Sequence, residues 1–470
     1  MYYLLAAAVI VAVVILVIHF YWSKPYLKEE QSFTKGDGKS IRVGIISDSQ
    51  LPGDGKPSKW TDRVEKALEL VKKNKADVLI YAGDFTDVGT KKAWKSFREK
   101  YEKVFSDQDI VPVFVMGNHD YWLPQLNKGF DIPTPAKMQK RFMKYTGEHP
   151  FSHKVVNGYH FIGWSSENGS YDKSYTNTDW ARKEIESAIK QSPDKPVFVI
   201  THLNPENSVY GSDEWGNSDI YSVLKDYPQV ISFSGHSHYS LLDERSIYQG
   251  EFTAINTQSI DYIELESGKF NGSVPCDAYG ESIADEVPAI MMMYADEGGV
   301  KIDRLNAVTG EKIKDSWIIN DPCDKASFTY TEEKRKAENK APWFEADAYG
   351  EIYETVSSKG KPITNVVFTA AKDDDFVHSY AIEYFDAEGN KLSFEKTDYD
   401  GHVLKKDGKT QFADRTIYFS SFMVGLDKMP EKEELRLTGH IPENAAYIKI
   451  YAVDSWGEES EPIKVKLNNI

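Results

Sequence analysis

Five short apolar runs, each followed directly by polar residues, constrain the fold of this chain more than any other feature of its sequence. Near-continuous apolar runs of this kind are typical of β-strands that are buried on both faces. Sheets of such strands carry helices on their outer faces, so we expect an α/β layered core. The five expected strands cover residues 41–47, 78–81, 110–116, 197–200 and 230–233.

Helical patterns separate these expected strands. Val64, Ala67, Leu68 and Val71 recur at the spacing that places side chains on one face of a helix. This alternation of strand and helix is the pattern of a layered α/β protein rather than of an all-β or all-α one. Three further helices are expected, near residues 91–105, 180–190 and 219–225.

The polar residues that follow the strands are of the kinds that bind metal ions. Ligands bind at the carboxyl ends of strands in such sheets, so clusters far apart in sequence can converge there. Mixed oxygen and imidazole ligands suit Mn²⁺, Fe or Zn²⁺, and so many of them favour two ions that share a bridging carboxylate. The clusters are Asp48-Ser49-Gln50, Gly83-Asp84, Gly117-Asn118-His119-Asp120, Thr201-His202 and Ser234-Gly235-His236-Ser237-His238.

The motifs D-x-Q, GDFTD, GNHD, H-x-x-P and GHSH occur in this order, and through them the chain resembles the calcineurin-like metallophosphoesterase family over roughly residues 40–310. The resemblance implies an α/β sandwich with layers in the order αββα and a pair of divalent metal ions, Mn, Fe or Zn. It also implies a ligand set. The first metal would be bound by Asp48 and His238, the second by Asn118, His202 and His236, and Asp84 would bridge both.

The resemblance further assigns roles beside the metals. His119 is expected to stabilise the transition state or to protonate the leaving oxygen, and Asp120 to orient His119 through a hydrogen bond. Asp87 is expected to support the loop after the second strand. Gln50 stands where the family usually places a histidine. Its uncharged amide oxygen favours Mn²⁺ or a weaker first site, unless the side chain points elsewhere.

Other aromatic and histidine residues have two readings. Trp122, Tyr210 and Trp215 lie in long connections that can shape a pocket or simply pack. A lone histidine outside an ordered motif is more often structural than catalytic. That structural reading applies to His149, His153, His160, His378, His402 and His440.

The strand and helix alternation stops after about residue 325. A charged, helix-compatible stretch, TEEKRKAENK, leads into short runs rich in β-branched and aromatic residues, which predict an all-β sandwich domain. The ending YIKIYAVDSWGEESEPIKV resembles the last two strands of fibronectin type III modules. We therefore expect a metallophosphoesterase domain at 40–325 and a fibronectin type III-like module at 326–470, with cell-wall or glycan contact as one role for that module.

The N-terminus predicts a membrane anchor. Residues 2–22 are almost entirely apolar, long enough in a helix to span the bilayer, and followed by no small-residue cleavage site. We expect a transmembrane anchor at 1–23, with His19 in its interfacial belt, and a polar tether at 24–39. Sandwich modules are common on bacterial cell-surface enzymes, and by that analogy we expect a single-pass membrane protein with an extracellular catalytic domain.

The net charge and the two cysteines limit which partners and which covalent links can be expected. The net charge of −17 makes a nucleic acid a poor partner, whereas a small phosphorylated substrate suits a site whose local field is set by metal ions. Cys276 and Cys323 either form a disulfide outside the cell or remain two thiols.

These observations combine into one leading hypothesis. The chain would be a metal-dependent phosphoesterase, in which a hydroxide that bridges two metals attacks a phosphate monoester or diester. One alternative is a catalytically degenerate scaffold that acts as a cell-surface binding or adhesion protein. Another is an enzyme that keeps the metals but hydrolyses a different ester or an anhydride.

Overall fold

The computed structural model describes ten stretches of the chain, which fall into two compact units. The first unit comprises residues 30–237, 247–261 and 288–328. The second takes residues 238–246, the described residues between 262 and 287, and those from 329 onward. The described stretches are residues 30–106, 110–123, 134–171, 173–263, 287–356, 360, 362–396, 402–420, 429–437 and 441–467.

Some sequence predictions fall on residues that the structure does not describe. Outside the described residues lie the expected membrane anchor at 1–23, the part of the tether at 24–29, Cys276 and His440. Among the helices that are described, none combines the length and the apolarity needed to cross a bilayer.

A six-stranded sheet forms one half of the first unit, with strand order β15-β14-β13-β2-β3-β4. β2, β3 and β4 run parallel, so the ends of all three point the same way, and β13 pairs antiparallel with β2. The strands predicted at 41–47, 78–81 and 110–116 are confirmed. The bounds are β2 (Ile41–Ile46), β3 (Val78–Tyr81), β4 (Val111–Phe114), β13 (Ala289–Asp296), β14 (Gly299–Asn306) and β15 (Lys312–Ile319).

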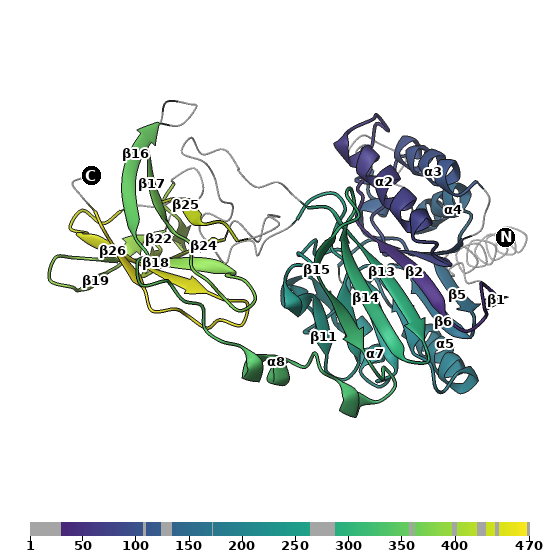
Figure 1. The fold of residues 1–470 in the computed structure, drawn as a ribbon. Coiled ribbons are helices and arrows are strands. Elements are labelled where there is room, and N and C mark those ends of the chain that lie inside the picture. Colours follow the sequence, from purple (N-terminus) through teal and green to yellow (C-terminus); the bar gives the residue numbers. More distant parts are fainter. Residues whose placement is uncertain are drawn as a thin grey trace, which may run out of the picture. The chain divides into compact units, whose positions relative to one another are not determined.

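Three helices pack on this sheet (Figure 1). Val64, Ala67, Leu68 and Val71 are fully buried in the core that the sheet and the helices share, as their spacing predicts. Ser58 caps the first helix in a reciprocal pair with Thr61, which stabilises its start. The helices are α2 (Lys59–Lys73), α3 (Lys91–Val104) and α4 (Pro135–Thr146).

A seven-stranded sheet forms the other half of the unit, in the order β1-β5-β6-β7-β10-β12-β11. α5 and α7 cover it and share a second apolar core with it (Figure 1). With helices outside two sheets, this unit has the α/β fold expected of a metallophosphoesterase. The bounds are β1 (Gln31–Phe33), β5 (Phe151–Val156), β6 (Tyr159–Trp164), β7 (Val197–Ile200), β10 (Val230–Ser234), β11 (Ile247–Gln249), β12 (Thr253–Asn256), α5 (Thr178–Gln191) and α7 (Ser218–Leu224).

Short elements occupy the connections of the first unit. The turn η1 lies in the connection that follows β4, and α6 lies between two residue pairs that form a small parallel bridge. The short elements are η1 (His119–Tyr121), β8 (Asn204–Pro205), α6 (Ser212–Trp215), β9 (Gly216–Asn217) and η3 (Lys325–Ser327).

The described residues of the second unit form β-strands and loops, apart from the short helix α8 (Glu332–Glu338) and the turn η2 (Glu244–Ser246). A three-stranded sheet, β16-β17-β25, and a five-stranded sheet built around β18 and β26 share one apolar core. An all-β C-terminal region is therefore confirmed, whereas its likeness to fibronectin type III modules stays a prediction. The strands are β16 (Gly350–Val356), β17 (Pro362–Thr369), β18 (Ser379–Phe385), β19 (Lys391–Leu392), β20 (Phe394–Glu395), β21 (Lys405–Lys406), β22 (Lys409–Thr410), β23 (Phe412–Ala413), β24 (Thr416–Phe419), β25 (Lys432–Arg436), β26 (Tyr447–Val453) and β27 (Ile463–Lys466).

Candidate metal centre

The predicted ligands of the first unit gather where β2, β3, β4, β7 and β10 end. The backbone ladder between β2 and β3 continues past the strands, because Asp48 N–H donates to Gly83 O at 3.1 Å and Gln50 N–H donates to Asp84 O at 3.0 Å. The end of β10 is tied to that of β7 in the same way, by Gly235 N–H donating to His202 O at 3.0 Å. The strand ends therefore bring Asp48, Asp84 and His202 into one place.

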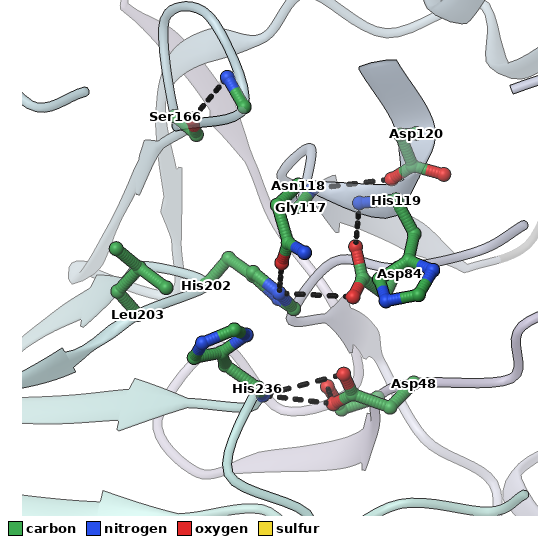
Figure 2. Close-up of polar contacts among 12 residues, drawn as sticks. Asp48, Asp84, Gly117, Asn118, His119, Asp120, Ser166, His202, Leu203 and His236 are labelled. Atoms are coloured by element: carbon green, nitrogen blue, oxygen red, sulfur yellow. Dashed lines mark hydrogen bonds and ion pairs between the residues drawn. The ribbon is translucent and has the colours of Figure 1, made fainter. Parts of the chain in front are cut away.

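His202 lies at the middle of this group (Figure 2). Its Nδ1 atom is 2.8 Å from the carbonyl oxygen of Ala82, which can only accept, so Nδ1 carries the hydrogen. In the neutral ring Nε2 then carries a lone pair. That atom faces two further oxygens, Asn118 Oδ1 at 2.9 Å and Asp84 Oδ2 at 3.1 Å.

When the ring is neutral, three lone pairs therefore converge with no hydrogen between them. Asp84 Oδ2 is buried and accepts no hydrogen bond from the described residues, although it lies beside His202 Nε2. Asp84, His202 and His236 each offer a ligand atom, and these atoms lie within 4.8 Å of one another. A buried cluster of acceptors needs a cation, and this donor set of carboxylate, amide and imidazole fits a divalent transition metal.

Asp48 lies on the other side of this group. Its carboxylate accepts from the backbone N–H of His236 at 3.2 and 3.3 Å and from the hydroxyl of Ser47. Ser259 Oγ donates to the Asp48 carbonyl at 2.8 Å, which fixes the backbone after β2. Asp48 is therefore fully buried and held in position before any metal binds.

Several of the predicted ligands have an unusual backbone conformation. Five predicted ligands have a left-handed φ, between 40° and 71°, which costs residues other than glycine on the order of 1–3 kcal/mol each. Such strain persists only where the surrounding structure enforces it, and it is concentrated at functional sites. The five residues are Asp48, Gln50, Asp84, His236 and His238.

The motif glycines leave room for the ligands. A Cβ atom on Gly117 would overlap the carboxylate of Asp84, and one on Gly235 would overlap Ser47 Oγ and the carboxylate of Asp48. Only a residue without a side chain lets these loops approach the carboxylates so closely. This is the physical reason for glycine in GNHD and GHSH.

His119 is held next to the centre by two contacts. Its backbone N–H donates to Asp84 Oδ1 at 2.9 Å (Figure 2). Its Nδ1 lies 2.8 Å from the carbonyl oxygen of Asp87. The Asp87 carboxylate is 3.6 Å from the same nitrogen. Because Nδ1–H is bound to Asp87, the ring can pass a proton only through Nε2.

The prediction that Asp120 orients His119 is wrong. The Asp120 carboxylate accepts from Thr86 N–H at 3.1 Å, from Thr86 Oγ1 at 2.9 Å and from Gly117 N–H at 3.1 Å. The η1 turn points this side chain back into the loops after β3 and β4, so it joins them instead of reaching the imidazole. Asp87 takes the orienting position.

Electrostatics couples these groups. Burial lowers the pKa of His202, but the carboxylate of Asp84 outweighs it and raises that pKa to about 9. Burial raises the pKa of Asp84, yet His202 and His119 hold it below its usual range. Burial and the charge of Asp84 raise the pKa of Asp120 to about 7. Without metal, a proton on His202 would balance Asp84, and metal binding would release that proton.

For two predicted ligands, Gln50 and His238, the structure gives the position of the residue in the fold. The backbone of Gln50 lies beside Asp84, and its side chain is nearly buried. His238 belongs to the second unit, where its Nδ1 lies 3.2 Å from the carbonyl oxygen of Tyr262. Metal binding by Gln50 and by His238 stays a prediction.

Aromatic rings flank the centre on two sides. Trp122 is 39% exposed, and its ring centroid lies 4.1 Å from that of His119. Tyr171, 46% exposed, and Trp215 lie 5.3 and 5.6 Å from the ring of His236. Tyr210, by contrast, is buried. Tyr171 could not be recognised from the sequence, because no motif near it indicates its approach to His236.

A comparison with known families decides the identity of this part of the chain. Residues 41–240 match the family model described as calcineurin-like phosphoesterase. These residues form a calcineurin-like phosphoesterase domain. The match covers somewhat less than half of the chain, and it ends before β13, β14 and β15, which nevertheless extend the same sheet.

Individual proteins similar to the phosphoesterase domain are distant. A probable glycerophosphodiester phosphodiesterase from Arcobacter nitrofigilis is 24% identical over 209 residues, which cover 41% of this chain and 70% of that protein. A purple acid phosphatase from yellow lupin (Lupinus luteus) seeds aligns with 12% identity and a TM-score of 0.41, over 60% of this chain and 54% of that one. A predicted phosphoesterase from Streptococcus pneumoniae aligns with 12% identity and a TM-score of 0.25, over 59% and 98%. TM-scores this low support no inference about the present chain.

The phosphoesterase domain confirms the predicted enzyme class, a metallophosphoesterase that hydrolyses phosphoric esters. Its family and the Asp84, His202 and His236 cluster agree in pointing to divalent metal. The number of metal ions, their identity and the substrate are matters for proposal.

Proposed function

We propose that this protein hydrolyses a phosphodiester or phosphomonoester of a small molecule with two divalent metal ions bound at the strand ends. The observation that carries the proposal is the convergence of His202 Nε2, Asn118 Oδ1 and Asp84 Oδ2, three atoms that have at most one proton to share and that a metal ion would bind in its place. Asp48 and His236 extend the donor set on one side of Asp84. We propose that Gln50 and His238 supply the remaining ligands of this donor set.

The metal ions would supply the electrostatic neutralisation of the phosphoryl group and a water of lowered pKa. The chain's own groups would do the rest. Asp84 and Asn118 would fix the ligand geometry, because the loops that carry them are locked by Asp120. His119, bound by Asp87 through Nδ1, would hold a proton on Nε2 and donate it to the leaving oxygen.

A phosphodiester is the first substrate class to test. The relative from Arcobacter nitrofigilis is named a probable glycerophosphodiester phosphodiesterase, and diesters carry only one negative charge to be balanced in the site. The exposed rings of Trp122 and Tyr171 would contact the ester group on either side of the phosphorus. A monoester is the second class.

The test is hydrolysis of bis-p-nitrophenyl phosphate and p-nitrophenyl phosphate by the full-length protein, stripped of metal and reloaded separately with Mn²⁺, Zn²⁺ or Fe²⁺. Turnover should depend on added metal and should be faster with the diester. His119→Ala should lower kcat by about 10²–10⁴-fold, the usual contribution of a general acid.

The matched control is His402→Ala, which removes an exposed histidine of the second unit. It should leave turnover unchanged. Loss of turnover in both variants, or turnover that needs no metal, would refute the proposed chemistry. Absence of turnover with every metal, together with less than one bound metal per chain, would instead favour the degenerate scaffold.

We also propose that the enzyme works at a membrane surface. The support is the apolar stretch at residues 2–22, whose length suits a bilayer span. Proteolysis of intact cells tests the extracellular placement: the catalytic unit should be digested from outside, and full protection would place it on the other side. Binding of the C-terminal β unit to a cell-wall glycan is a further proposal, testable by sedimentation with purified cell walls.

A further inference from the structure

A second pair of histidines lies buried in the seven-stranded sheet, at the other end from the metal centre. His153 is on β5 and His160 is on β6, and both are 1% exposed. His160 pairs with Val197, the first residue of β7, whereas His202 follows the last residue of that strand. Five residues at about 3.3 Å each separate the two positions by about 16 Å. The pair is therefore independent of the phosphoesterase centre.

The hydrogen on His153 is fixed by its outer neighbour. Nδ1 of His153 lies 2.8 Å from Glu184 Oε2 on α5. An ionised carboxylate only accepts, so Nδ1 carries the hydrogen and donates it. In the neutral ring, Nε2 is left with a lone pair.

The hydrogen on His160 is fixed in the same way. Nε2 of His160 lies 3.2 Å from Ser192 Oγ, and that hydroxyl gives its one hydrogen to the carbonyl oxygen of Gly158 at 2.9 Å. With the hydroxyl hydrogen on Gly158, Nε2 is the donor to Ser192, and this assignment leaves a lone pair on Nδ1. Burial, together with the neighbouring His153, lowers the pKa of His160 to about 4, so the ring is neutral at physiological pH.

The two remaining nitrogens face each other. His153 Nε2 and His160 Nδ1 are 2.9 Å apart, and on this assignment each presents a lone pair to the other. Two buried acceptors at that distance repel unless a cation lies between them. His202 shows the same arrangement in the metal centre, with one ring nitrogen held by an acceptor and the other facing acceptors.

A second carboxylate lies beside the two rings. Glu30 Oε2 is 3.7 Å from His153 Nδ1, on the side of the ring that faces Glu184, and Gln191 Nε2 donates to Glu30 Oε2 at 2.9 Å, so Glu30 would have to turn towards Nε2 to share an ion with the imidazoles. Glu30, His153 and His160 each offer a ligand atom, and these atoms lie within 4.8 Å of one another. The Glu30 side chain is 32% exposed, which leaves a side open for an ion to enter.

We propose that Glu30, His153 and His160 bind a structural zinc ion. Two imidazoles and a carboxylate form a ligand set that zinc uses in proteins. Histidines that bind zinc usually donate their other ring N–H to a carboxylate or another acceptor, as His153 does to Glu184 and His160 does to Ser192. At a Zn–N distance of about 2.1 Å, tetrahedral geometry needs the two nitrogens about 3.4 Å apart, so the rings separate by about 0.5 Å on binding.

The role of this zinc follows from the position of Glu30. That residue immediately precedes β1, a strand of three residues that pairs only with β5 among the described strands. A bond from Glu30 to the metal would tie the start of the folded domain to β5 and β6. The zinc would then act as a clamp where the chain enters the phosphoesterase domain, and it would take no part in hydrolysis.

The test measures bound zinc in full-length protein whose catalytic centre is disabled by Asp84→Asn. The protein is stripped with a chelator, dialysed against ZnCl₂ and analysed by mass spectrometry for metal content. Adding His160→Gln should remove one zinc per chain, and adding His402→Gln should remove none. Cobalt in place of zinc should give a visible absorption band that His160→Gln abolishes.

His160→Gln changes a buried side chain and could prevent folding. Glu30→Gln is therefore the second variant, because it changes a partly exposed carboxylate. It should weaken zinc binding at least about tenfold. In the otherwise native chain, His160→Gln should leave diester hydrolysis intact. Equal zinc content with and without His160→Gln and Glu30→Gln would overturn the proposal and would mean that the two imidazoles share only a proton.

Discussion

The Nε2 atom of His202 lies 3.1 Å from Oδ2 of Asp84, and the hydrogen of the imidazole is on the far side of the ring, bound to Ala82. The pair is therefore set to share a cation. A proton can serve in the absence of metal, and a divalent ion replaces it with release of that proton.

The first prediction concerns this pair. Asp84→Asn keeps the shape of the side chain but removes the charge that balances the cation, so we expect metal affinity to fall by at least about 100-fold, more than the usual effect of losing a supporting group. Hydrolysis should fall with it. Isothermal titration of the stripped protein with Mn²⁺ measures the change, and unaltered affinity would show that Asp84 is no ligand.

The second prediction tests the need for glycine in GNHD. A methyl group at position 117 would overlap the Asp84 carboxylate, so Gly117→Ala should abolish metal binding and cost about 1–3 kcal/mol of unfolding free energy. Gly147→Ala is the control, because that position has a φ of +77° but open space around it. It should cost about 1–2 kcal/mol through its backbone alone and leave metal binding unchanged.

The third prediction separates Asp87 from Asp120. Asp87→Asn should lower kcat with little change in stability, because it removes the carboxylate charge 3.6 Å from His119 Nδ1 while the main-chain bond from Nδ1 to Asp87 O remains. Asp120→Asn would set an amide N–H₂ against Gly117 N–H or the Thr86 donors, and it should cost about 1–3 kcal/mol of stability. Steady-state kinetics beside chemical denaturation distinguishes them. The reverse pattern would restore Asp120 as the orienting group.

The fourth prediction concerns the exposed aromatic rings. Trp122→Ala and Tyr171→Ala should each raise KM for bis-p-nitrophenyl phosphate by several-fold, corresponding to the loss of about 0.5–1.5 kcal/mol of ring contact. The effect on a glycerol-based diester should be smaller, since it offers no ring. If both substrates lose affinity equally, the rings act by supporting His119 and His236 rather than by touching the substrate.

The fifth prediction is a pH dependence of the second unit. Burial and the charge of Arg245 lower the pKa of His378 to about 3, against about 6.5 in an unfolded chain. Between these values only the unfolded state takes up the proton. The free energy of unfolding therefore falls as the pH drops below about 6.5, by about 1.4 kcal/mol per pH unit until the pH nears 3.

Asp243 acts in the same direction at lower pH. Burial raises its pKa, but the ion pair with Arg245 lowers it to about 2, so its contribution is present above about pH 4 and is lost as the pH falls towards 2. Hydrogen exchange of β18 and β26 at pH 7, 6 and 5 measures the trend. His378→Gln should flatten it, and an unchanged slope would show that His378 is not its source.

The sequence by itself determined the strands that end at the centre and predicted which polar residues gather there. Residues 78–81 and 197–200 are β3 and β7 to the residue, because a buried parallel strand needs an apolar side chain at every position. β5 was missed, since FSHKVV carries a histidine and a lysine into the interior. Both are buried there only because Glu184 and Glu148 come from elsewhere to pair with them.

Only the tertiary structure decided which neighbours these side chains meet. Sequence placed Asp120 beside His119, yet the η1 turn directs it to Thr86 and gives Asp87 the contact with the ring. The pairing of His153 with His160 likewise arises from strand register and from α5 lying above it. The burial of an apolar strand such as β3 or β7 is encoded by its own residues, whereas a polar contact depends on the direction that a turn gives the chain. That direction is set by packing between segments far apart in sequence.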